Sequence, residues 1–238
     1  MKNKQRTIGK RIGHLLLVMV LLFFVITIGE VVVYKYLPVQ VTPLMLIRKV
    51  QAHREGKTLT IQQQWVDIEA ISPELVRAVI ASEDNLFLKH NGFSKNGLRN
   101  AIQEKIKTGT VRHGGSTISQ QTAKNVFCTH RRTYLRKVFE AYYTVLIELI
   151  WGKRRIMEVY LNVIEMGNGV FGAEAASQTY FHHSASGLSR SEAALIAVCL
   201  PNPRKLSVAH PSNYVLHRKT QIMTLMPKMG KINLEPSK

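Results

Sequence analysis

Residues 80–93, which read IASEDNLFLKHNGF, determine how the rest of the chain is interpreted. An apolar run ends there in two adjacent carboxylates, Glu83 and Asp84, in a chain with only 15 acidic residues against 33 Lys plus Arg. Neighbouring carboxylates repel each other and burial raises a carboxyl pKa, so both effects can move one carboxylate toward the range of a general base. By itself, the stretch is equally compatible with a solvated end of a helix.

A helix is predicted directly before this stretch. Residues 72–74, Ser-Pro-Glu, combine an N-cap residue, a proline at the first helical position and an acid in the first turn. The apolar stripe that follows delivers Glu83 at the C-terminal end of this helix. The preceding residues 65–71 alternate weakly between apolar and polar and are expected to be extended.

The composition limits the size of the fold and the class of partner. At 238 residues the chain is long enough for one domain with a core that folds unaided. Its formal charge of +18 and pI near 10.1 predict an anionic partner, which can be nucleic acid, an acidic membrane surface or a phosphorylated substrate. The two cysteines, Cys128 and Cys199, match no metal-binding spacing and are expected to be free thiols.

A membrane anchor is predicted at the N-terminus. Residues 1–11 form a basic tail, and residues 12–36 form an apolar run of about 25 residues, enough for a helix to cross a hydrocarbon core of roughly 30 Å. The run is too long for a signal peptide and lacks a small-x-small cleavage site, so an uncleaved anchor is favoured over a signal peptide or a buried core helix. Because the positive charges precede the run, the N-terminus is expected in the cytoplasm and the rest of the chain outside it.

The remaining chain is expected to form a linker, one domain and a tail. Residues 37–64 are predicted to be a membrane-proximal linker, whose basic patch at 48–54 is either a membrane contact or a solvated face. Residues 65–228 are predicted to form the domain, and residues 229–238 the C-terminal tail.

A second dense stretch, residues 114–125, reads GGSTISQQTAKN. Two glycines allow backbone amides to approach a ligand closely, and Ser116 or Thr117 can cap the helix that follows. The N-terminus of such a helix presents free N–H groups to an anion. Four polar side chains then fall largely on one side of the helix, which is either a binding face or a solvated surface: Gln120, Gln121, Lys124 and Asn125.

Helices are predicted over most of the other segments. The basic residues 153–155 are expected to interrupt two of them, and Ser189 with Glu192 three residues on forms a capping box before another. The predicted helices cover residues 95–107, 134–151, 156–166, 193–200 and 213–226.

Four of these stretches occur in the order of a known family. They are the Glu-Asp-x-x-Phe-x-x-His-x-Gly pattern at 83–92, the GGSTISQQxxKN run at 114–125, Arg-Lys-x-x-Glu at 136–140 and Glu-Val-Tyr-Leu-Asn at 158–162. Together they resemble the peptidoglycan glycosyltransferases of glycosyltransferase family 51, the polymerase modules of class A penicillin-binding proteins and their single-domain relatives. The match runs from about Trp65 to Met226. Because the chain ends at Lys238 without room for a transpeptidase domain, it is similar to the monofunctional members.

The resemblance implies a fold, a reaction and a location. The expected fold is mainly α: a lysozyme-like helical glycosyltransferase domain over residues 65–228, with one N-terminal transmembrane helix. The implied reaction joins lipid II, a disaccharide-pentapeptide on undecaprenyl pyrophosphate, into β-1,4-linked glycan strands and releases the lipid pyrophosphate. The implied location is the bacterial inner membrane, with the N-terminus cytoplasmic and the domain periplasmic. Implied partners are lipid II, the growing glycan strand, membrane lipids and proteins of cell-wall synthesis or division, without nucleic acid.

The resemblance also assigns roles to residues. Glu83 matches the base that deprotonates the acceptor hydroxyl, and Glu140 matches a second carboxylate that orients cations or steadies the oxocarbenium-like centre. Inversion at C1 fits direct displacement with a single base. A divalent cation such as Mg²⁺ beside Asp84 or Glu83 is compatible with this scheme, although no ligand cluster in the sequence demands a metal. The residues expected to bind sugars or pyrophosphate are Asp84, Ser116, Thr117, Gln120, Gln121, Lys124, Asn125, Arg132, Arg136 and Lys137.

Two rival functions belong to other classes. A lytic glycosidase of lysozyme-like fold would carry a similar catalytic Glu but would cleave glycan polymer instead of consuming lipid II. A membrane-anchored scaffold that binds nucleic acid or anionic lipid would explain the positive charge but not the ordered Glu and Gln motifs. The expected topology also places nucleic acid on the wrong side of the membrane.

Overall fold

The computed structural model describes residues 2–94, 99, 106, 115–129 and 133–235. The chain divides into two units, Met1–Leu37 and Pro38–Lys238. The finer segment boundaries expected from the sequence remain a prediction. The helix predicted over 95–107, the glycine at 114 and Arg132 lie outside the described residues.

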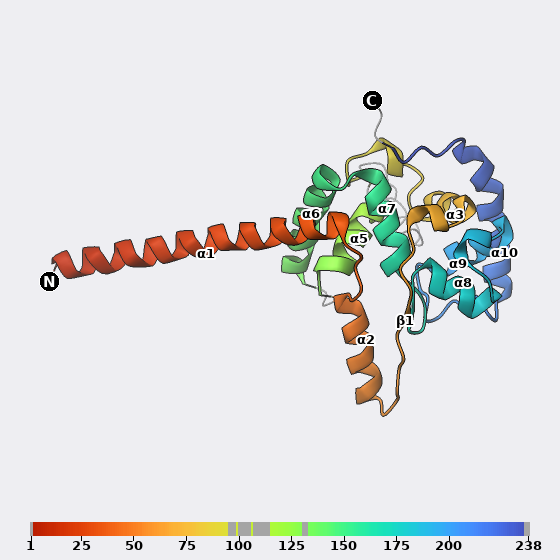
Figure 1. Ribbon diagram of the computed structural model, residues 1–238, viewed down its shortest axis with the longest axis horizontal. Helices are drawn as coiled ribbons and strands as arrows, with labels where there is room; N and C mark the ends of the chain where they lie inside the picture. Colours follow the sequence, from red (N-terminus) through yellow and green to blue (C-terminus); the bar gives the residue numbers. More distant parts are fainter. Residues whose placement is uncertain (1, 95–98, 100–105, 107–114, 130–132, 236–238) are drawn as a thin grey trace. The chain divides into compact units, whose positions relative to one another are not determined.

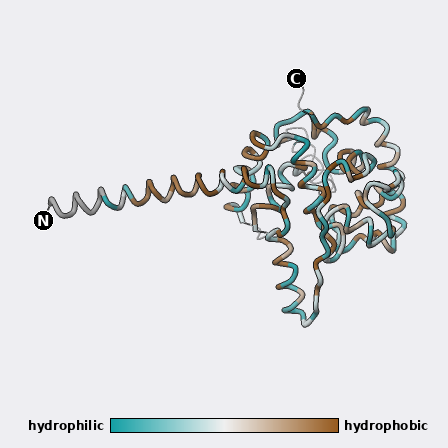
Figure 2. The backbone as a smooth tube through the Cα atoms, in the orientation of Figure 1, coloured by the Kyte–Doolittle hydropathy of each residue, from teal (hydrophilic) through white to brown (hydrophobic). Residues whose placement is uncertain are grey.

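The first unit is one long helix, α1 (Lys2–Tyr36). Its apolar part, Gly13–Tyr36, is 24 residues long, and Figure 2 shows apolar residues along it. Among the described parts of the chain, this is the one helix that is long and apolar enough to cross a membrane. Because a bilayer core needs about 20 helical residues, length and composition allow α1 to serve as a membrane anchor.

The second unit is mainly helical, with a small sheet and a few 3-10 turns (Figure 1). This agrees with the expected lysozyme-like helical fold. In chain order the elements are α2 (Pro43–Arg54), β1 (Gln62–Gln63), η1 (Ile68–Ala70), α3 (Pro73–Glu83), η2 (Phe87–Lys89), α5 (Ile118–Phe127), α6 (Tyr134–Ile150), α7 (Gly152–Val163), β2 (Glu165–Gly167), β3 (Val170–Phe171), α8 (Ala173–Phe181), η3 (Ala185–Gly187), α9 (Arg190–Cys199), α10 (Asn213–Leu225) and η4 (Met226–Met229).

Local capping signals determine where several helices begin. The Ser72 side chain accepts a hydrogen bond from the Glu74 N–H, and proline occupies the first helical position of α3, as predicted. Thr117 and Ser189 each form a capping box at the start of α5 and α9. Each of these side chains satisfies a backbone N–H that has no partner within its helix.

The core joins two groups of helices. Helices α3, α9 and α10 pack on one another, and α5 packs against both α6 and α7. Helix α7 is largely enclosed, because every residue from Ile156 to Val163 is buried. The functional stretches predicted from the sequence therefore lie on helices held by a shared core, with Glu83 at the end of α3 and the Gly-Ser-Thr stretch leading into α5.

A three-stranded sheet of order β1-β3-β2 packs against α8. Strand β1 is parallel to β3, with Gln62 opposite Val170, whereas β2 is antiparallel to β3 and contains a register shift. Gly172 follows β3 at φ +82°, and a Cβ there would lie 2.6 Å from the Asn162 carbonyl oxygen. Only glycine combines this backbone conformation with so close an approach to α7.

Three local predictions were wrong, and long-range contacts explain two of them. Residues 65–71 are not simply extended: Ile68–Ala70 is a 3-10 turn, and the Asn162 side chain binds both the N–H and the carbonyl of Val66 at 2.9 Å. Residues 165–167 are a strand rather than the end of a helix, since Glu165 pairs with β3 and its carboxylate binds Arg48 of α2. Local periodicity contains neither contact.

The third error concerns residues 153–155, which belong to the first turn of α7 and do not interrupt a helix. The break lies one residue earlier, at Gly152, whose φ of +74° separates α6 from α7. Glycine adopts this left-handed conformation without steric penalty. The two cysteines, Cys128 and Cys199, are buried free thiols, and burial raises their pKa to about 11 and about 12.

Candidate active site

Glu83 is the last residue of α3, and its side chain is half-buried. Burial raises its pKa above the ordinary 4.5, and the negative charge of Asp84 acts in the same direction. A hydrogen bond from Gln121 and the positive charges of Lys124 and Arg218 partly oppose this shift. A carboxyl group whose pKa is raised in this way is suited to accept a proton near neutral pH.

Gln121 on α5 connects Glu83 to the core. Its amide nitrogen donates to Glu83 Oε2 at 2.9 Å and to the Ser116 carbonyl at 3.5 Å. Its amide oxygen accepts a hydrogen bond from the buried Tyr160 hydroxyl at 3.3 Å. An ionised carboxylate and a backbone carbonyl can only accept hydrogen bonds. Glu83 and the Ser116 carbonyl therefore determine that the nitrogen of the Gln121 amide faces Glu83.

The Asp84 carboxylate makes polar contacts with His90 and with the backbone of α5. The His90 Nε2 atom lies 3.0 and 2.9 Å from its two carboxyl oxygens, and the Ile118 N–H donates to Oδ2 at 3.1 Å. Ile118 is the first residue of α5, so Asp84 connects the end of α3 to the start of α5. These contacts place Asp84 beside Glu83 at the junction of α3 and α5, and its expected contact with substrate remains a prediction.

Thr117 and Gln120 form the cap of α5. The Thr117 hydroxyl donates to the Gly92 carbonyl at 2.6 Å and accepts from the Gln120 N–H at 3.1 Å. The Gln120 side-chain oxygen in turn accepts from the Thr117 N–H at 3.0 Å. The cap therefore ties α5 to the chain after Asp84, while the roles of Ser116, Thr117 and Gln120 toward a substrate remain predictions.

Lys124 lies one turn after Gln121 on α5, close enough to both predicted catalytic carboxylates to interact electrostatically with them. Burial lowers the pKa of Lys124 from 10.5, and the negative charges of Glu140 and Glu83 oppose this shift. Among the described residues, Lys124 has no ion pair within 4.0 Å. The ammonium group therefore remains available to an anionic ligand.

Asn125 follows Lys124 on α5 and is only 1% exposed. Its Nδ2 atom is buried without a hydrogen-bond partner in the part of the chain that the structure describes. A buried donor without a partner is unfavourable in the free protein. This is compatible with the predicted ligand contact of Asn125.

The third predicted group lies in the first two turns of α6. Glu140 is 2% exposed, and its carboxylate binds Arg136 Nη1 at 2.5 Å and Lys137 Nζ at 2.7 Å. The two cations come from the preceding turn, at spacings of four and three residues. The structure thus joins three of the predicted residues, whereas Arg132 lies outside the described residues.

No group of three or more His, Cys, Asp or Glu residues that could hold a metal ion occurs among the described residues. The divalent cation considered from the sequence therefore has no such ligand group among the residues that the structure describes, and it remains a prediction. The carboxylate of Asp84, one expected metal contact, is engaged by His90 and α5.

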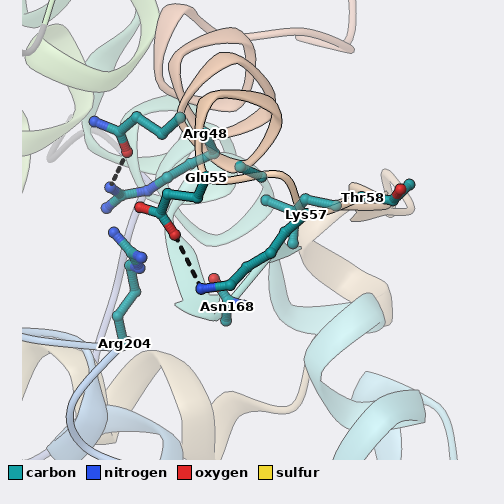
Figure 3. A pocket seen from close by; sticks show the side chains of 9 residues that line it. Arg48, Glu55, Lys57, Thr58, Asn168 and Arg204 are labelled. Atoms are coloured by element: carbon teal, nitrogen blue, oxygen red, sulfur yellow. Dashed lines mark hydrogen bonds and ion pairs between the residues drawn. The ribbon is translucent and has the colours of Figure 1, made fainter.

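A pocket of about 100 Å³ lies elsewhere, beside the end of α2 (Figure 3). Arg48 and Lys57 line it, but Arg48 binds Glu165 and Gln51, and Lys57 binds Glu55 at 3.1 Å. None of the predicted catalytic residues lines this pocket. It is therefore not the candidate active site.

Four residues that lie near Glu83 or near the residues that follow it were not predicted as site residues from the sequence. The Tyr160 hydroxyl donates a hydrogen bond to Gln121, and the positive charge of Arg218 lowers the pKa of Glu83. Both residues belong to helices that are distant in sequence from Glu83. Glu148 and Lys153 form a 2.7 Å ion pair beside the residues that follow Glu83. In the sequence both residues lie in the stretch 148–153, which reads ELIWGK, with Glu148 as an acid within an apolar run.

Comparisons with known proteins agree with the geometry. The transglycosylase family model matches residues 51–227. A biosynthetic peptidoglycan transglycosylase of Bacteroides thetaiotaomicron is 51% identical over 208 residues, which are 87% of this chain and 84% of the relative. Proteins of the same name from Bdellovibrio bacteriovorus and Caulobacter vibrioides are 50% and 46% identical, over 86% and 91% of this chain and 81% and 92% of theirs. The chain therefore belongs to the transglycosylase family.

Proposed function

We propose that this protein polymerises lipid II into β-1,4-linked glycan strands and releases undecaprenyl pyrophosphate. Family membership makes it a peptidoglycan glycosyltransferase of bacterial cell-wall synthesis. The identity of the donor, the inverting course of the reaction and the roles of individual residues are the content of this proposal.

The observation that carries the proposal is the contrast between two carboxylates that both interact with residues of α5. Glu83 meets an amide donor and has a raised pKa, whereas Glu140 binds two cations directly. A proton acceptor needs a carboxyl group with a raised pKa, as at Glu83. An anionic leaving group needs fixed cations, as at Glu140. In this proposal Glu83 removes the proton from the acceptor hydroxyl as its oxygen attacks C1 of the donor.

In this proposal the leaving pyrophosphate binds to the positively charged side chains of α5 and α6. Lys124 has no ion pair within 4.0 Å among the described residues, and Arg136 and Lys137 are held in place by Glu140. Charge-assisted hydrogen bonds from such groups stabilise negative charge as the bond to C1 breaks. Gln120 and Asn125, on the same helix as Lys124, are assigned to sugar or phosphate oxygens.

The proposed location is the bacterial inner membrane, with a cytoplasmic N-terminus and a periplasmic catalytic domain. The apolar helix α1 and the basic residues that precede its apolar part support this topology. Both substrates would carry lipid tails, so the enzyme has to work next to a bilayer. Helix α6 also exposes apolar side chains, including Leu135, Val138 and Leu149, as expected for a surface near lipid.

The test is an assay of the purified full-length protein with labelled lipid II. We expect long glycan products and a lipid pyrophosphate, and inhibition of both by a moenomycin-type compound. A parallel incubation with preformed glycan polymer separates the rival lytic activity. Cleavage of polymer without consumption of lipid II would overturn the proposal in favour of a glycosidase, and inactivity on both substrates would favour a scaffold.

A further inference from the structure

We infer that Lys153 and Glu148 are positioning residues, which hold the base loop (residues 84–93) against α5 and α6 and thereby keep Glu83 in place. The inference rests on the proposed function, because it assumes that Glu83 is the base. Neither residue was expected in the site, and both belong to the junction between α6 and α7.

Lys153 contacts the base loop at two residues, His90 and Phe87. Its ammonium donates to the His90 carbonyl at 2.6 Å and to Glu148 Oε1 at 2.7 Å, and it lies 4.6 Å from the centre of the Phe87 ring. The Lys153 side chain is only 17% exposed. An ammonium group has three donors, so two hydrogen bonds and a cation–π contact account for its main directions.

Glu148, a residue of α6, connects Lys153 to α5. Its side chain is 8% exposed and accepts a hydrogen bond from the Ser119 hydroxyl on α5. The base loop also touches α6 directly at Gly92, which has φ +86°. A Cβ on Gly92 would lie 2.7 Å from Thr144 Cγ2 and 3.1 Å from Glu148 Cγ, so the close packing of the base loop on α6 leaves no room for a side chain there.

The path from this pair to the base is short. His90, whose carbonyl binds Lys153, places its Nε2 atom 2.9 Å from the nearer Asp84 carboxyl oxygen. Asp84 is adjacent to Glu83 and binds the first N–H of α5. Glu83 in turn binds Gln121, three residues farther along α5. Displacing the base loop would therefore disturb the alignment of α3 with α5 that places Glu83.

Buried charges make the design of variants important. Removing Lys153 alone would leave the Glu148 carboxylate buried without its cation, which destabilises a fold strongly. The combined substitution Lys153→Met and Glu148→Gln removes both charges and keeps the approximate size of both side chains. A matched control is Arg77→Met with Glu74→Gln, which removes a 2.6 Å ion pair from the opposite end of α3.

The experiment compares the wild type, the Lys153/Glu148 double variant and the Arg77/Glu74 control with labelled lipid II, and normalises each rate to folded protein. We expect the double variant to lose on the order of 100-fold in kcat, as is typical for a misplacement of about 1 Å. KM for lipid II should change much less, because the cations near Glu140 remain. The control should keep the wild-type kcat.

Hydrogen–deuterium exchange gives a second readout that does not depend on activity. We expect faster exchange in the base loop of the double variant and unchanged exchange there in the control. An unchanged kcat in folded double variant, or unchanged exchange in the base loop, would overturn the inference. If the wild type failed to polymerise lipid II, the proposed function would fail, while exchange would still show whether the pair holds the base loop.

Discussion

Glu83 and Glu140 are two carboxylates of the candidate site, the first half-buried and the second buried, and their surroundings are opposite. Glu83 has a neutral amide as its direct partner, and burial raises its pKa. Glu140 has two direct cationic partners, Arg136 and Lys137. The first group can take up a proton, whereas the second balances fixed positive charge. The difference shows that the environment of a carboxylate, rather than its residue type, determines its role.

The largest expected effect is that of Glu83→Gln, which removes the proposed base and should lower polymerisation by at least about 100-fold. A raised pKa in the folded state means that the ionised carboxyl destabilises the fold, so stability falls as pH rises through that pKa. The variant should thus be at least as heat-stable as the wild type at pH 8. Lipid II turnover and thermal unfolding measure the two effects.

Glu74→Gln on the same helix is the control for this substitution, because Glu74 lies in the first turn of α3. It should leave turnover unchanged. Near-normal glycan synthesis by Glu83→Gln would remove Glu83 from the mechanism and end the contrast between the two carboxylates.

Lys124→Ala is expected to have the next largest effect, on the order of 100-fold in kcat/KM, since it removes a cation that faces both carboxylates. Titration with lipid II should show weaker binding of the donor. Lys219→Ala, which removes a lysine that binds Ser191 at 3.1 Å, is the control. Unchanged binding of lipid II by Lys124→Ala would contradict the assignment of Lys124 to the pyrophosphate.

Glu140→Gln should have a smaller effect on activity, roughly 10-fold, because the cations remain but lose the group that orients them. It should also lower the free energy of unfolding by about 1–3 kcal/mol, as the hydrogen bonds to a charged partner are lost. Chemical denaturation and lipid II titration test these two effects. A loss of kcat as large as that of Glu83→Gln, with unchanged binding, would show that the two carboxylates share the chemistry.

The smallest expected effect is that of Gln121→Met, which removes the N–H that lowers the Glu83 pKa. The Glu83 pKa should rise further, so activity on the acid side should appear at higher pH than in the wild type. The pH dependence of kcat/KM measures this shift. Gln178→Met, which removes an amide bound to Glu174 on α8, is the control. An unmoved acid limb would show that Gln121 does not tune the base.

Local signals predicted much of the fold. The N-cap at Ser72, the cap at Thr117 and the capping box at Ser189 all lie where helices begin. These signals act within one helical turn, so they can be identified from neighbouring residues alone. The strand at 165–167 was missed because so short a strand is defined by its pairing with β3, which periodicity does not contain.

The sequence by itself determined the apolar length of α1 and the ends of several helices, through periodicity and capping, and its ordered motifs indicated the family. Only the tertiary structure decided that Gln121, 38 residues from Glu83, donates to it, and that Lys153 binds the base loop 63 residues earlier at His90. The physical reason is that periodicity and capping depend on residues within a few positions. Burial and charge, which shift a pKa, depend on segments that packing brings together.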